Sequence, residues 1–583
     1  DYLKTKQPWV ADWGSTGPLN YVLLQQGTNI NTFNNNVKNI IHKNYDDTSR
    51  KVTAIKFSDI YLHNNYNGDA QSGARIEYVK LFTALALFIL VIACINFMNL
   101  STAKASRRFK EVGIKKVVGA ERKQLIFQFL SESILLTVFA MVFAIMIAIL
   151  LLPAFNQITG KNISLHFTWQ MITAVICIAL ITGFIAGSYP ALYLSKFNPL
   201  SILKGNLNTS TAELLSRKGL VVFQFTLSTI LIIAVFIIYQ QIQFIQNADP
   251  GYNKNNILRI TSEGNIAAKQ DVFISELKKI PGVKNASASD HRLVGHNFAS
   301  GGLEWPGEEP NEGFMFEKFG VQYGFIETMG MHIKEGRSFS KDYSSDSSNI
   351  IINEATAKAM HLKNPVGTTV KYFGHDAQII GVVKDFHFES MHEAIKPSVI
   401  DIVPHCKTIV ASIQGNNQKA TINAIQHLYE SFNPGFPFTF NFLDEAYQQQ
   451  YESETRVSVL SKYFAGLAII ISCLGLFGLA AFTAQKRRKE IGIRKVVGAS
   501  VSSITTMLSK DFLKLIFFSL LIAFPVSWWL MNNWLQSFAY RINITPWIFI
   551  VTGFLVIIIT LLTISFQSIK AAIANPVKSL RTE

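Results

Sequence analysis

Seven long apolar runs without a charged residue dominate the pattern of hydrophobic and polar positions along the chain. They fall at about 81–103, 133–155, 170–194, 219–245, 463–484, 515–535 and 546–566. A helix of about 20 apolar residues crosses the hydrocarbon core of a bilayer, which is about 30 Å thick. Buried helices of soluble proteins rarely stay uncharged over such a length. The pattern therefore predicts an α-helical polytopic membrane protein with seven transmembrane helices.

The polar segment between the fourth and fifth runs, 246–462, is long enough to be a folded domain. Short apolar runs at 350–352 and 377–383, bounded by Gly and Pro, are typical of strands. Helical periodicity appears at 273–280 and 420–432. The segment is expected to form a large α+β domain outside the membrane.

Basic residues gather in two of the short linkers between the apolar runs. Linker 103–130 carries eight and linker 485–510 carries seven, whereas 156–169 and 536–545 carry one each. Lys and Arg in short loops favour the cytoplasmic side. The sequence therefore places 1–78 and 246–462 outside and the C-terminal tail inside. Because the net charge of +15 belongs to this cytoplasmic face, nucleic acid is not expected as a partner.

An eleven-residue motif occurs twice in the chain. The sequence Lys110-Glu111-Val112-Gly113-Ile114-Lys115-Lys116-Val117-Val118-Gly119-Ala120 recurs as Lys489-Glu490-Ile491-Gly492-Ile493-Arg494-Lys495-Val496-Val497-Gly498-Ala499. Each copy follows one apolar run and precedes two more. The last run of each set of three leads into a similar tail, at 198–204 and at 575–581. The two three-span halves are therefore predicted to be an internal duplication.

Each copy of the motif is predicted to form a short amphipathic cytoplasmic helix near the membrane surface. Ile114, Val117 and Val118 share one helical face, while Lys115 and Lys116 project from the other side. A single copy suits an interfacial anchor as well as a docking site. Two matched copies favour docking of a partner. The expected partner-binding residues are Lys110, Glu111, Gly113, Lys115, Lys116, Gly119, Lys489, Glu490, Gly492, Arg494, Lys495 and Gly498.

The glycines of the motif are expected to have two different roles. Gly119 and Gly498 are placed to end the helix and to let the chain turn. Gly113 and Gly492 are expected to allow close approach of a partner's backbone, where a larger side chain would clash.

On this motif the chain resembles the FtsX-like, MacB-type permeases of ABC transporters, in which the motif forms a cytoplasmic coupling helix that contacts the ATPase. Similar exterior segments are Gly324–Met331, Glu335–Phe339, Ile351–Ala355, Pro365–Thr368 and Ile380–Phe386. The resemblance implies an inner-membrane protein whose partners are an ATP-binding-cassette ATPase, a second permease of the same or another kind, the lipid bilayer and a periplasmic adaptor. It also implies that the exterior segment is a MacB-like periplasmic core domain.

The resemblance also organises the chain into parts. Residues 1–78 match the last portion of a first exterior domain, so an N-terminal truncation is expected. Residues 79–218 form the first three-span unit, 219–245 a helix leading to the exterior domain at 246–462, and 463–583 the second three-span unit. Two-halved members of the family have eight spans, one more than the seven runs here.

Motifs for catalysis or for cofactors do not appear in the sequence. There is no Gly-x-x-x-x-Gly-Lys-Ser/Thr phosphate loop, no His-Glu-x-x-His or Cys-x-x-Cys metal motif and no Gly-x-Ser-x-Gly nucleophile motif. The expectation is therefore a non-enzyme without catalytic residues, bound metal or cofactor, with the ATPase on a partner subunit. The spans also lack central ionisable residues, which argues against ion-coupled transport.

Two functions follow from these observations. The first is a permease subunit that converts the ATP cycle of its partner into movement of the periplasmic domains, for export or expulsion of a substrate. The alternative is a sensory or regulatory membrane protein whose exterior domain binds a signal or controls a cell-envelope enzyme.

The predicted topology can be tested with single cysteines and an impermeant thiol reagent. With the outer membrane permeabilised, cysteines at Ser340 and Asn416 should react in intact cells, because both lie in the segment placed outside. Cysteines at Ser106 and Ser500, in the basic linkers, should not react. Labelling at Ser500 before the inner membrane is breached would contradict the topology.

Overall fold

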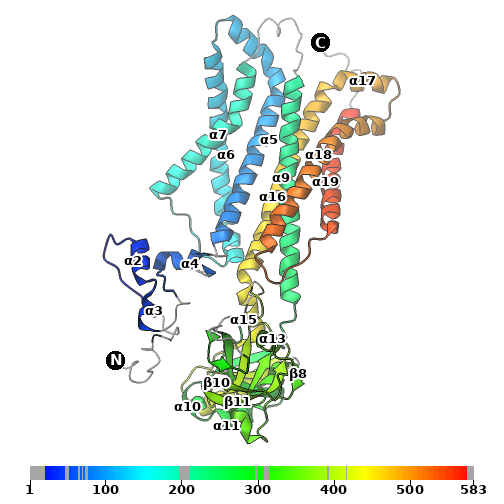
Figure 1. The fold of residues 1–583 in the computed structure, drawn as a ribbon. Coiled ribbons are helices and arrows are strands. Elements are labelled where there is room, and N and C mark those ends of the chain that lie inside the picture. The colour runs from blue at the N-terminus through cyan, green and yellow to red at the C-terminus, as the bar shows by residue number, and fades with distance from the viewer. Residues whose placement is uncertain are drawn as a thin grey trace. The chain divides into compact units, whose positions relative to one another are not determined.

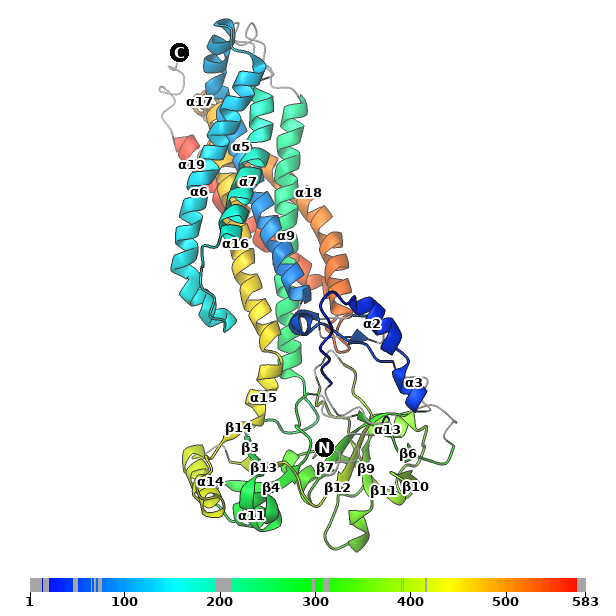
Figure 2. The ribbon, with the colours of Figure 1, turned by 90° about the vertical axis from the view of Figure 1, so that its left-hand side faces the viewer.

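The structure is a computed structural model that describes residues 13, 20–45, 51–63, 66–67, 70–71, 76–195, 211–295, 299–307, 314–389, 391, 393–414 and 417–573. The chain has two compact units (Figures 1 and 2). The sheet unit comprises Asp1–Lys80 and Asp249–Gln450, and the helical unit comprises Leu81–Ala248 and Tyr451–Glu583. The similar tails at 198–204 and 575–581 lie outside the described residues, as does Asn416.

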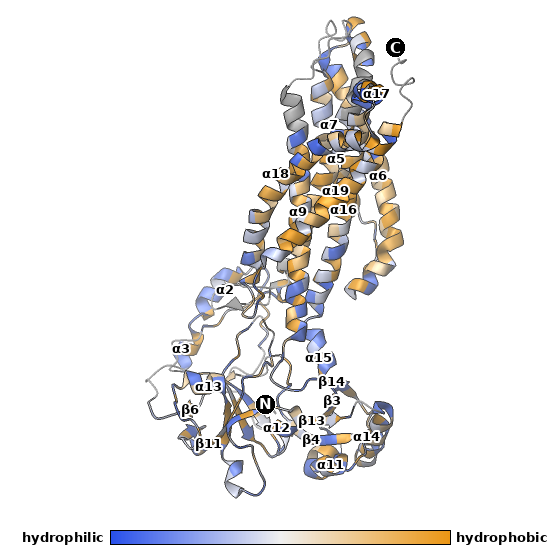
Figure 3. Ribbon diagram, turned by 90° about the vertical axis from the view of Figure 1, so that its right-hand side faces the viewer, coloured by the Kyte–Doolittle hydropathy of each residue, from blue (hydrophilic) through white to orange (hydrophobic). Residues whose placement is uncertain are grey.

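Seven helices in the described part of the chain are long and apolar enough to cross a membrane, which confirms the predicted number. They are α5 (Ile76–Val117), α6 (Arg122–Thr159), α7 (Trp169–Ser195), α9 (Thr211–Asn247), α16 (Glu452–Lys486), α18 (Val501–Leu535) and α19 (Pro546–Ile573). Figure 3 shows hydrophobic residues along most of the length of these helices.

Several of the helices begin well before their apolar runs, α6 and α18 among them. α6 begins at Arg122 and α18 at Val501, each after a capping residue. Glu121 forms a capping box at the start of α6, and the side chain of Ser500 accepts a backbone amide at the start of α18. The capped first turns therefore lie in the basic linkers, outside the hydrocarbon. Within the hydrocarbon an unpaired amide would be costly.

The first copy of the motif is not a separate helix, in contrast to the prediction. It forms the last turns of α5, which continues without a break to Val117. The second copy forms a helix of its own, α17 (Arg488–Val496), after a break at Arg487. Arg487 has φ −91° and ψ 15°, and its side chain pairs with Asp511 at 3.0 Å. Neither junction contains Pro or Gly, so no helix breaker distinguishes the two copies.

Helix α9 is the most buried of the seven spans. Its residues Val221, Phe225 and Ile232 form one apolar cluster with residues of α16, α18 and α19. A second cluster joins Leu85 and Ile92 of α5 to α9 and α16. The second half of the duplication therefore packs around α9.

A few polar contacts tie the spans together. The hydroxyls of Ser228 in α9 and Ser472 in α16 lie 2.7 Å apart. Gln241 is fully buried, donates to Tyr540 O at 2.8 Å and accepts from Ile542 N at 2.9 Å. It therefore holds the loop between α18 and α19 against α9.

The two asparagines of the first span, Asn96 and Asn99, are turned toward the inside of the helical unit. Asn96 Nδ2 donates to Ile471 O in α16 at 3.3 Å, and Asn99 is 1% exposed. Opposite Asn96 lies Gly475, where an added Cβ would come within 2.8 Å of Asn96 Oδ1. Polar side chains within spans are usually turned toward neighbouring helices in this way.

The Gly183-x-x-x-Gly187 pattern in α7 lets that helix pack close to α6. A Cβ added at Gly183 would lie 2.9 Å from Ile134 Cα, and one at Gly187 would lie 2.6 Å from Ser133 Cβ. Real Cβ atoms do not approach backbone so closely, so these two helices pack at a distance that only glycine permits.

The sheet unit contains a mixed sheet with the strand order β14-β3-β13-β4-β7-β12-β9-β11-β10-β6, with β5 paired to β7 and β8 paired to β11. The strands are β3 (Ile257–Thr261), β4 (Val283–Ser289), β5 (Ala299–Ser300), β6 (Leu303–Glu304), β7 (Phe316–Val321), β8 (Ile333–Gly336), β9 (Ile350–Asn353), β10 (Thr369–Tyr372), β11 (His375–Val383), β12 (Ser398–Ile402), β13 (Thr408–Ile413) and β14 (Phe440–Phe442). The strands expected at 350–352 and 377–383 are thus β9 and β11.

The helices of the sheet unit are short. Those of the main domain are α10 (Gly264–Ala268), α11 (Gln270–Leu277), α12 (Phe325–Met329), η3 (Ser344–Ser347), α13 (Glu354–Ala359), α14 (Gln418–Phe432) and α15 (Leu443–Gln450). The N-terminal segment contains α2 (Ile30–Val37), α3 (Ile40–Asn44), η2 (Phe57–Asp59), α4 (Ile60–His63), β1 (Tyr66–Asn67) and β2 (Ala70–Gln71). The helices expected at 273–280 and 420–432 correspond to α11 and α14.

Alternate residues of the sheet belong to different apolar cores. Along β13, Ile409 and Ala411 pack with Phe273 of α11 and Tyr429 of α14. Val410, between them, belongs to the cluster that contains residues of α12 and α15. This period of two follows from the pleat of a strand whose two faces are both covered.

The exterior segments that carry the family resemblance fix one corner of the sheet. Gly336 has φ +75°, and an added Cβ there would collide with Ile380 O across the β8–β11 pair. Arg337 donates two hydrogen bonds, of 2.6 and 2.7 Å, to Asp346, which is fully buried. Asn353 Oδ1 accepts the amide at the start of α13 and a second amide from β12. These residues are explained by packing and hydrogen bonding within the domain.

Because α6 and α7 pack closely, adding a methyl group at Gly183 should destabilise the protein. Gly183→Ala should lower the free energy of unfolding by about 1–3 kcal/mol, because the new Cβ overlaps backbone that must shift. Gly466→Ala in α16 is the matched control, since nothing lies within 4 Å of its added Cβ. Thermal unfolding of the purified protein in detergent measures both. Equal melting temperatures for the two variants would contradict the close approach.

The Arg337–Asp346 pair predicts an acid sensitivity of the sheet unit. Hydrogen bonding from Arg337 lowers the pKa of Asp346 below its ordinary value of 3.8. The stabilisation is therefore complete above the ordinary pKa and is lost as the pH falls through the lower pKa of the folded state. Arg337→Met should reduce the free energy of unfolding by about 2–3 kcal/mol at neutral pH and should weaken this acid dependence.

The control is Lys279→Met, which removes an exposed ion pair with Glu276 in the same unit. Its effect should stay within about 0.5 kcal/mol, because exposed pairs contribute little. Denaturant unfolding at neutral and at strongly acidic pH measures both variants. An equal loss of unfolding free energy in the two variants would show that the burial of Asp346 does not strengthen its ion pair.

Candidate functional site

Both copies of the duplicated motif end in the same turn. In the first copy Gly119 N donates to Lys116 O at 3.1 Å, and Ala120 N donates to Lys115 O at 2.9 Å. The second copy has the same two bonds at the same lengths. The φ angles are +103° at Gly119 and +94° at Gly498. This is a Schellman motif, which requires a left-handed residue and so confirms the predicted role of these glycines.

Each copy turns its apolar face outward. The exposed fractions are 60% for Ile114, 63% for Val117 and 82% for Val118, against 55% for Ile493, 66% for Val496 and 81% for Val497. Equivalent positions thus differ by only a few per cent. Two exposed Ile-Val-Val faces on matched helices are surfaces that a membrane interface or a partner protein could cover.

The acidic residue of each copy pairs with the basic residue one turn later. Lys115 Nζ lies 2.8 Å from Glu111 Oε1, and Arg494 Nη2 lies 3.0 Å from Glu490 Oε1. All four side chains are between 39% and 53% exposed. Such exposed pairs add only about 0.3–0.5 kcal/mol, so they mainly orient charge beside the apolar face.

The opposite side of each motif helix packs against its own half of the chain. Val112 is 1% exposed and packs with residues of α6 and α7, while Ile491 is 4% exposed and packs with residues of α18 and α19. The α6 and α18 members of the two clusters occupy equivalent positions of the duplication. They are Leu125 and Phe129 in the first half, and Ile504 and Leu508 in the second.

Gly113 and Gly492 are both buried within the chain. The expectation that they admit the backbone of a partner stays a prediction. Lys110 and Lys489 lie at the start of the motif, but their side chains are outside the described part of the structure.

The second basic residue of each copy reaches the end of a transmembrane helix. Lys116 Nζ donates to Ser195 O at the end of α7, and Lys495 Nζ donates to Ala572 O at the end of α19, both at 2.7 Å. Carbonyls in the last turn of a helix lack an intrahelical partner and carry the negative end of the helix dipole. A hydrogen bond from a charged donor typically contributes about 1.5–3 kcal/mol. Partial burial, and then the nearby charge of Arg122, lower the pKa of Lys116.

Sequence reasoning did not predict a role for the acceptors Ser195 and Ala572. Their spacing from the repeated tails could nevertheless have identified them. Each acceptor lies three residues before the Asn-Pro pair that opens the similar tails, Asn198-Pro199 and Asn575-Pro576. The acceptors therefore occupy equivalent positions of the duplication, as do the two lysines.

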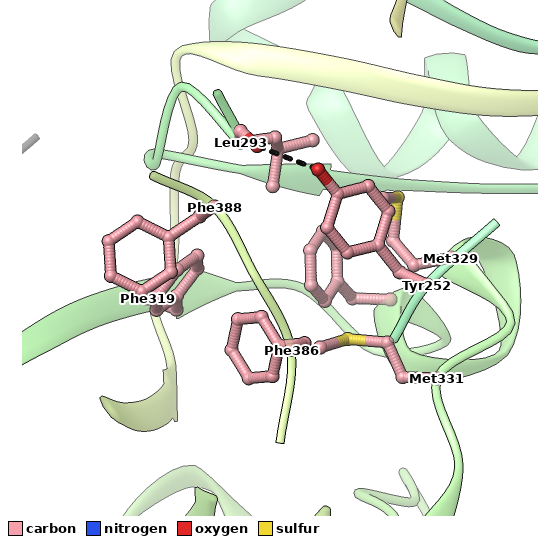
Figure 4. Close-up of a pocket in the computed structure, with 8 residues that line it drawn as sticks. Tyr252, Leu293, Phe319, Met329, Met331, Phe386 and Phe388 are labelled. Atoms are coloured by element: carbon pink, nitrogen blue, oxygen red, sulfur yellow. Dashed lines mark hydrogen bonds between the residues drawn. The ribbon is translucent and has the colours of Figure 1, made fainter. Parts of the chain in front are cut away.

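The sheet unit offers a weaker candidate, a small apolar pocket (Figure 4). It is lined by Tyr252, Leu293, Phe319, Phe325, Met329, Met331, Phe386 and Phe388. Its free volume of about 10 Å³ is too small for any organic ligand. Tyr252 satisfies its hydroxyl by donating to Leu293 O at 3.4 Å. We interpret the pocket as a packing gap in the core.

A buried histidine beside this core is also accounted for by its neighbours. His291 is fully buried and accepts the amide of Leu293 at Nδ1, at 2.9 Å. Its Nε2 therefore carries the proton and donates to Glu317 Oε1, at 2.9 Å. Among the described residues, no group of three or more His, Cys, Asp or Glu side chains could hold a metal ion.

Comparison with known families agrees with this organisation. The FtsX-like permease C-terminal model matches both halves of the duplication, at residues 83–199 and 463–576. The MacB-like periplasmic core domain model matches residues 220–425. The chain belongs to the FtsX-like, MacB-type permeases. Members of this family are permease components of ABC transporters, and this permease is accordingly a multi-pass membrane protein with an extracytoplasmic domain.

Individual relatives of this FtsX-like permease match over parts of their length. It is 30% identical over 130 residues to the macrolide export ATP-binding/permease protein MacB of Bdellovibrio bacteriovorus, covering 21% of this chain and 19% of the relative. It is 24% identical over 200 residues to an uncharacterized ABC transporter permease of Methanocaldococcus jannaschii, covering 33% of this chain and 48% of the relative. The matches therefore span less than half of the length of either relative.

Solved structures of related exterior domains also match. The periplasmic region of MacB from Actinobacillus actinomycetemcomitans is 16% identical, covering 34% of this chain and 92% of that one, with a TM-score of 0.25. The extracellular domain of the transporter YknZ from Gram-positive bacteria is 17% identical, covering 32% and 97%, with a TM-score of 0.24.

Proposed function

We propose that this chain is the permease subunit of an ABC transporter and that a separate ATPase subunit docks on both copies of the duplicated motif. The observation that carries the proposal is the pair of outward Ile-Val-Val faces, whose exposed fractions agree position by position. A surface that only anchored the helix to lipid would not need the same exposed residues, the same ion pair and the same terminal turn in both halves.

The packing of the helical unit supports a route from the docking site to the exterior domain. α17 contacts α19 and α18 through the cluster around Ile491, and α19 packs with α9 and α16. α9 leads into the sheet unit, and α16 leads out of it. Movement imposed on the motif helices by an ATP cycle would therefore reach the helices that flank the exterior domain. The work done there is export or expulsion of a substrate.

The remaining partners belong to the same proposal. The MacB relative of Bdellovibrio bacteriovorus combines ATP binding with a permease in one protein, whereas no phosphate-binding loop occurs in these 583 residues. A second permease copy, a periplasmic adaptor and a location in the inner membrane follow from the family resemblance and complete the assembly.

Substitution of the outward face tests the docking proposal. The variant Ile114→Ser, Val118→Ser, Ile493→Ser, Val497→Ser should reach the membrane at normal levels but bind the ATPase at least about tenfold more weakly, since each lost apolar side chain removes on the order of 1 kcal/mol of contact. The ATPase is first identified by affinity purification from native membranes. Its binding to purified variants is then measured by titration.

Val272→Ser is the matched control, because Val272 is 53% exposed and belongs to the sheet unit, whereas the motif belongs to the helical unit. Its ATPase binding should equal that of the unmodified protein. Unchanged ATPase binding by the four-residue variant would indicate that the motif is an interfacial anchor and not a docking site. We avoid substitutions at Gly113 and Gly492, since both are buried and their loss would disturb the chain's own packing.

A further inference from the structure

We infer that Lys116 and Lys495 are positioning residues that lock each motif helix to the third span of its own half, so that α7 and α19 receive the movement of a docked ATPase. This inference rests on the docking function proposed above. It adds which residues connect the docking surface to the membrane, and through which helices.

The first argument is that the contact occurs twice. Each lysine is the seventh residue of its motif, and each acceptor lies three residues before its Asn-Pro tail. The donor–acceptor distance is 2.7 Å in both halves. A chance surface contact of a long flexible side chain would not be expected to recur at equivalent positions with the same length.

The second argument is the division of roles around each motif helix. The outward face holds the exposed Ile-Val-Val residues, and the flank holds the ion pair of Glu111 with Lys115 or of Glu490 with Arg494. The second lysine of each copy points inward, to the helix end, beside the apolar cluster of Val112 or Ile491. Lys115 also donates to Gln128 of α6, at 3.1 Å, but does not reach a helix end. The second lysine is therefore separate from the docking surface, and its loss need not affect docking.

The third argument concerns the choice of side chain. The residue four positions after each acceptor is a proline, Pro199 or Pro576, which has no amide hydrogen to donate to that carbonyl. A cationic donor satisfies such a carbonyl and interacts favourably with the helix dipole. The bond thus joins the motif helix to the end of the third span by a directional contact, in addition to non-directional apolar packing.

The two halves differ in what the third span contacts next. Val556 and Ile564 of α19 pack in one cluster with residues of α9 and α16, which flank the exterior domain. α7 packs closely on α6 at Gly183 and Gly187. Lys495 therefore connects more directly than Lys116 to the helices that carry the exterior domain, and its removal should have the larger effect.

The test compares Lys116→Met, Lys495→Met and the double variant with the unmodified protein in reconstituted membranes, together with the co-purified ATPase. Binding of the ATPase and ATP turnover per bound ATPase are measured separately. We expect binding to stay within about twofold and coupled turnover to fall about tenfold in the double variant, with Lys495→Met lower than Lys116→Met. Lys→Arg at both positions should restore coupling, because a guanidinium can donate to the same carbonyls.

The matched control is Lys123→Met with Lys510→Met, which removes two exposed charges from α6 and α18 without touching the motif or the inward contact. Turnover per bound ATPase should then remain normal. Normal coupling in the double Lys116/Lys495 variant would overturn the inference while leaving docking intact. Loss of binding together with coupling would also overturn it, because the lysines would then shape the docking surface itself. Failure of the unmodified protein to bind any ATPase would instead refute the proposed function.

Discussion

The helical unit depends on a constraint that lipid imposes: apolar side chains gain little by leaving hydrocarbon for one another. Helices in a bilayer are therefore held by close approach and by a few polar contacts. Gly183 and Gly187 supply the close approach between α6 and α7. The Ser228–Ser472 hydroxyl pair and the two bonds of Gln241 supply polar contacts around α9. With the spans fixed in this way, the cytoplasmic ends can present two matched surfaces.

The same constraint explains why the lysine contacts lie where they do. Within the hydrocarbon, a helix satisfies its own backbone, but its last carbonyls need other donors. In both halves the motif lysine provides one, so the residue that completes a span also ties that span to the motif helix. One hydrogen bond from the lysine can thus both satisfy the carbonyl at the helix end and transmit movement to that helix. The same turn at Gly119 and Gly498 ends the helix directly after each outward face.

The exterior domain follows the physics of soluble proteins. Its two-sided sheet is stabilised by apolar cores, and its recognisable segments are explained by local geometry. Gly336 permits close backbone approach between β8 and β11, Arg337 neutralises the buried Asp346, and Asn353 joins a strand to the helix that follows it. Resemblance in these segments therefore reports a shared architecture. The chemistry of a substrate is not encoded in them.

The sequence by itself determined the seven spans, the strands β9 and β11, and the duplication, because each depends on a local pattern of apolar residues or on direct repetition. It also predicted the turns at Gly119 and Gly498, since a left-handed helix end strongly favours glycine. Tertiary structure decided that Gly113 and Gly492 are buried, that the first motif continues α5, and that Lys116 and Lys495 reach helix ends. Those facts depend on which helix packs beside the motif, and helical periodicity cannot distinguish an inward lysine from an outward one when both flank the same apolar face.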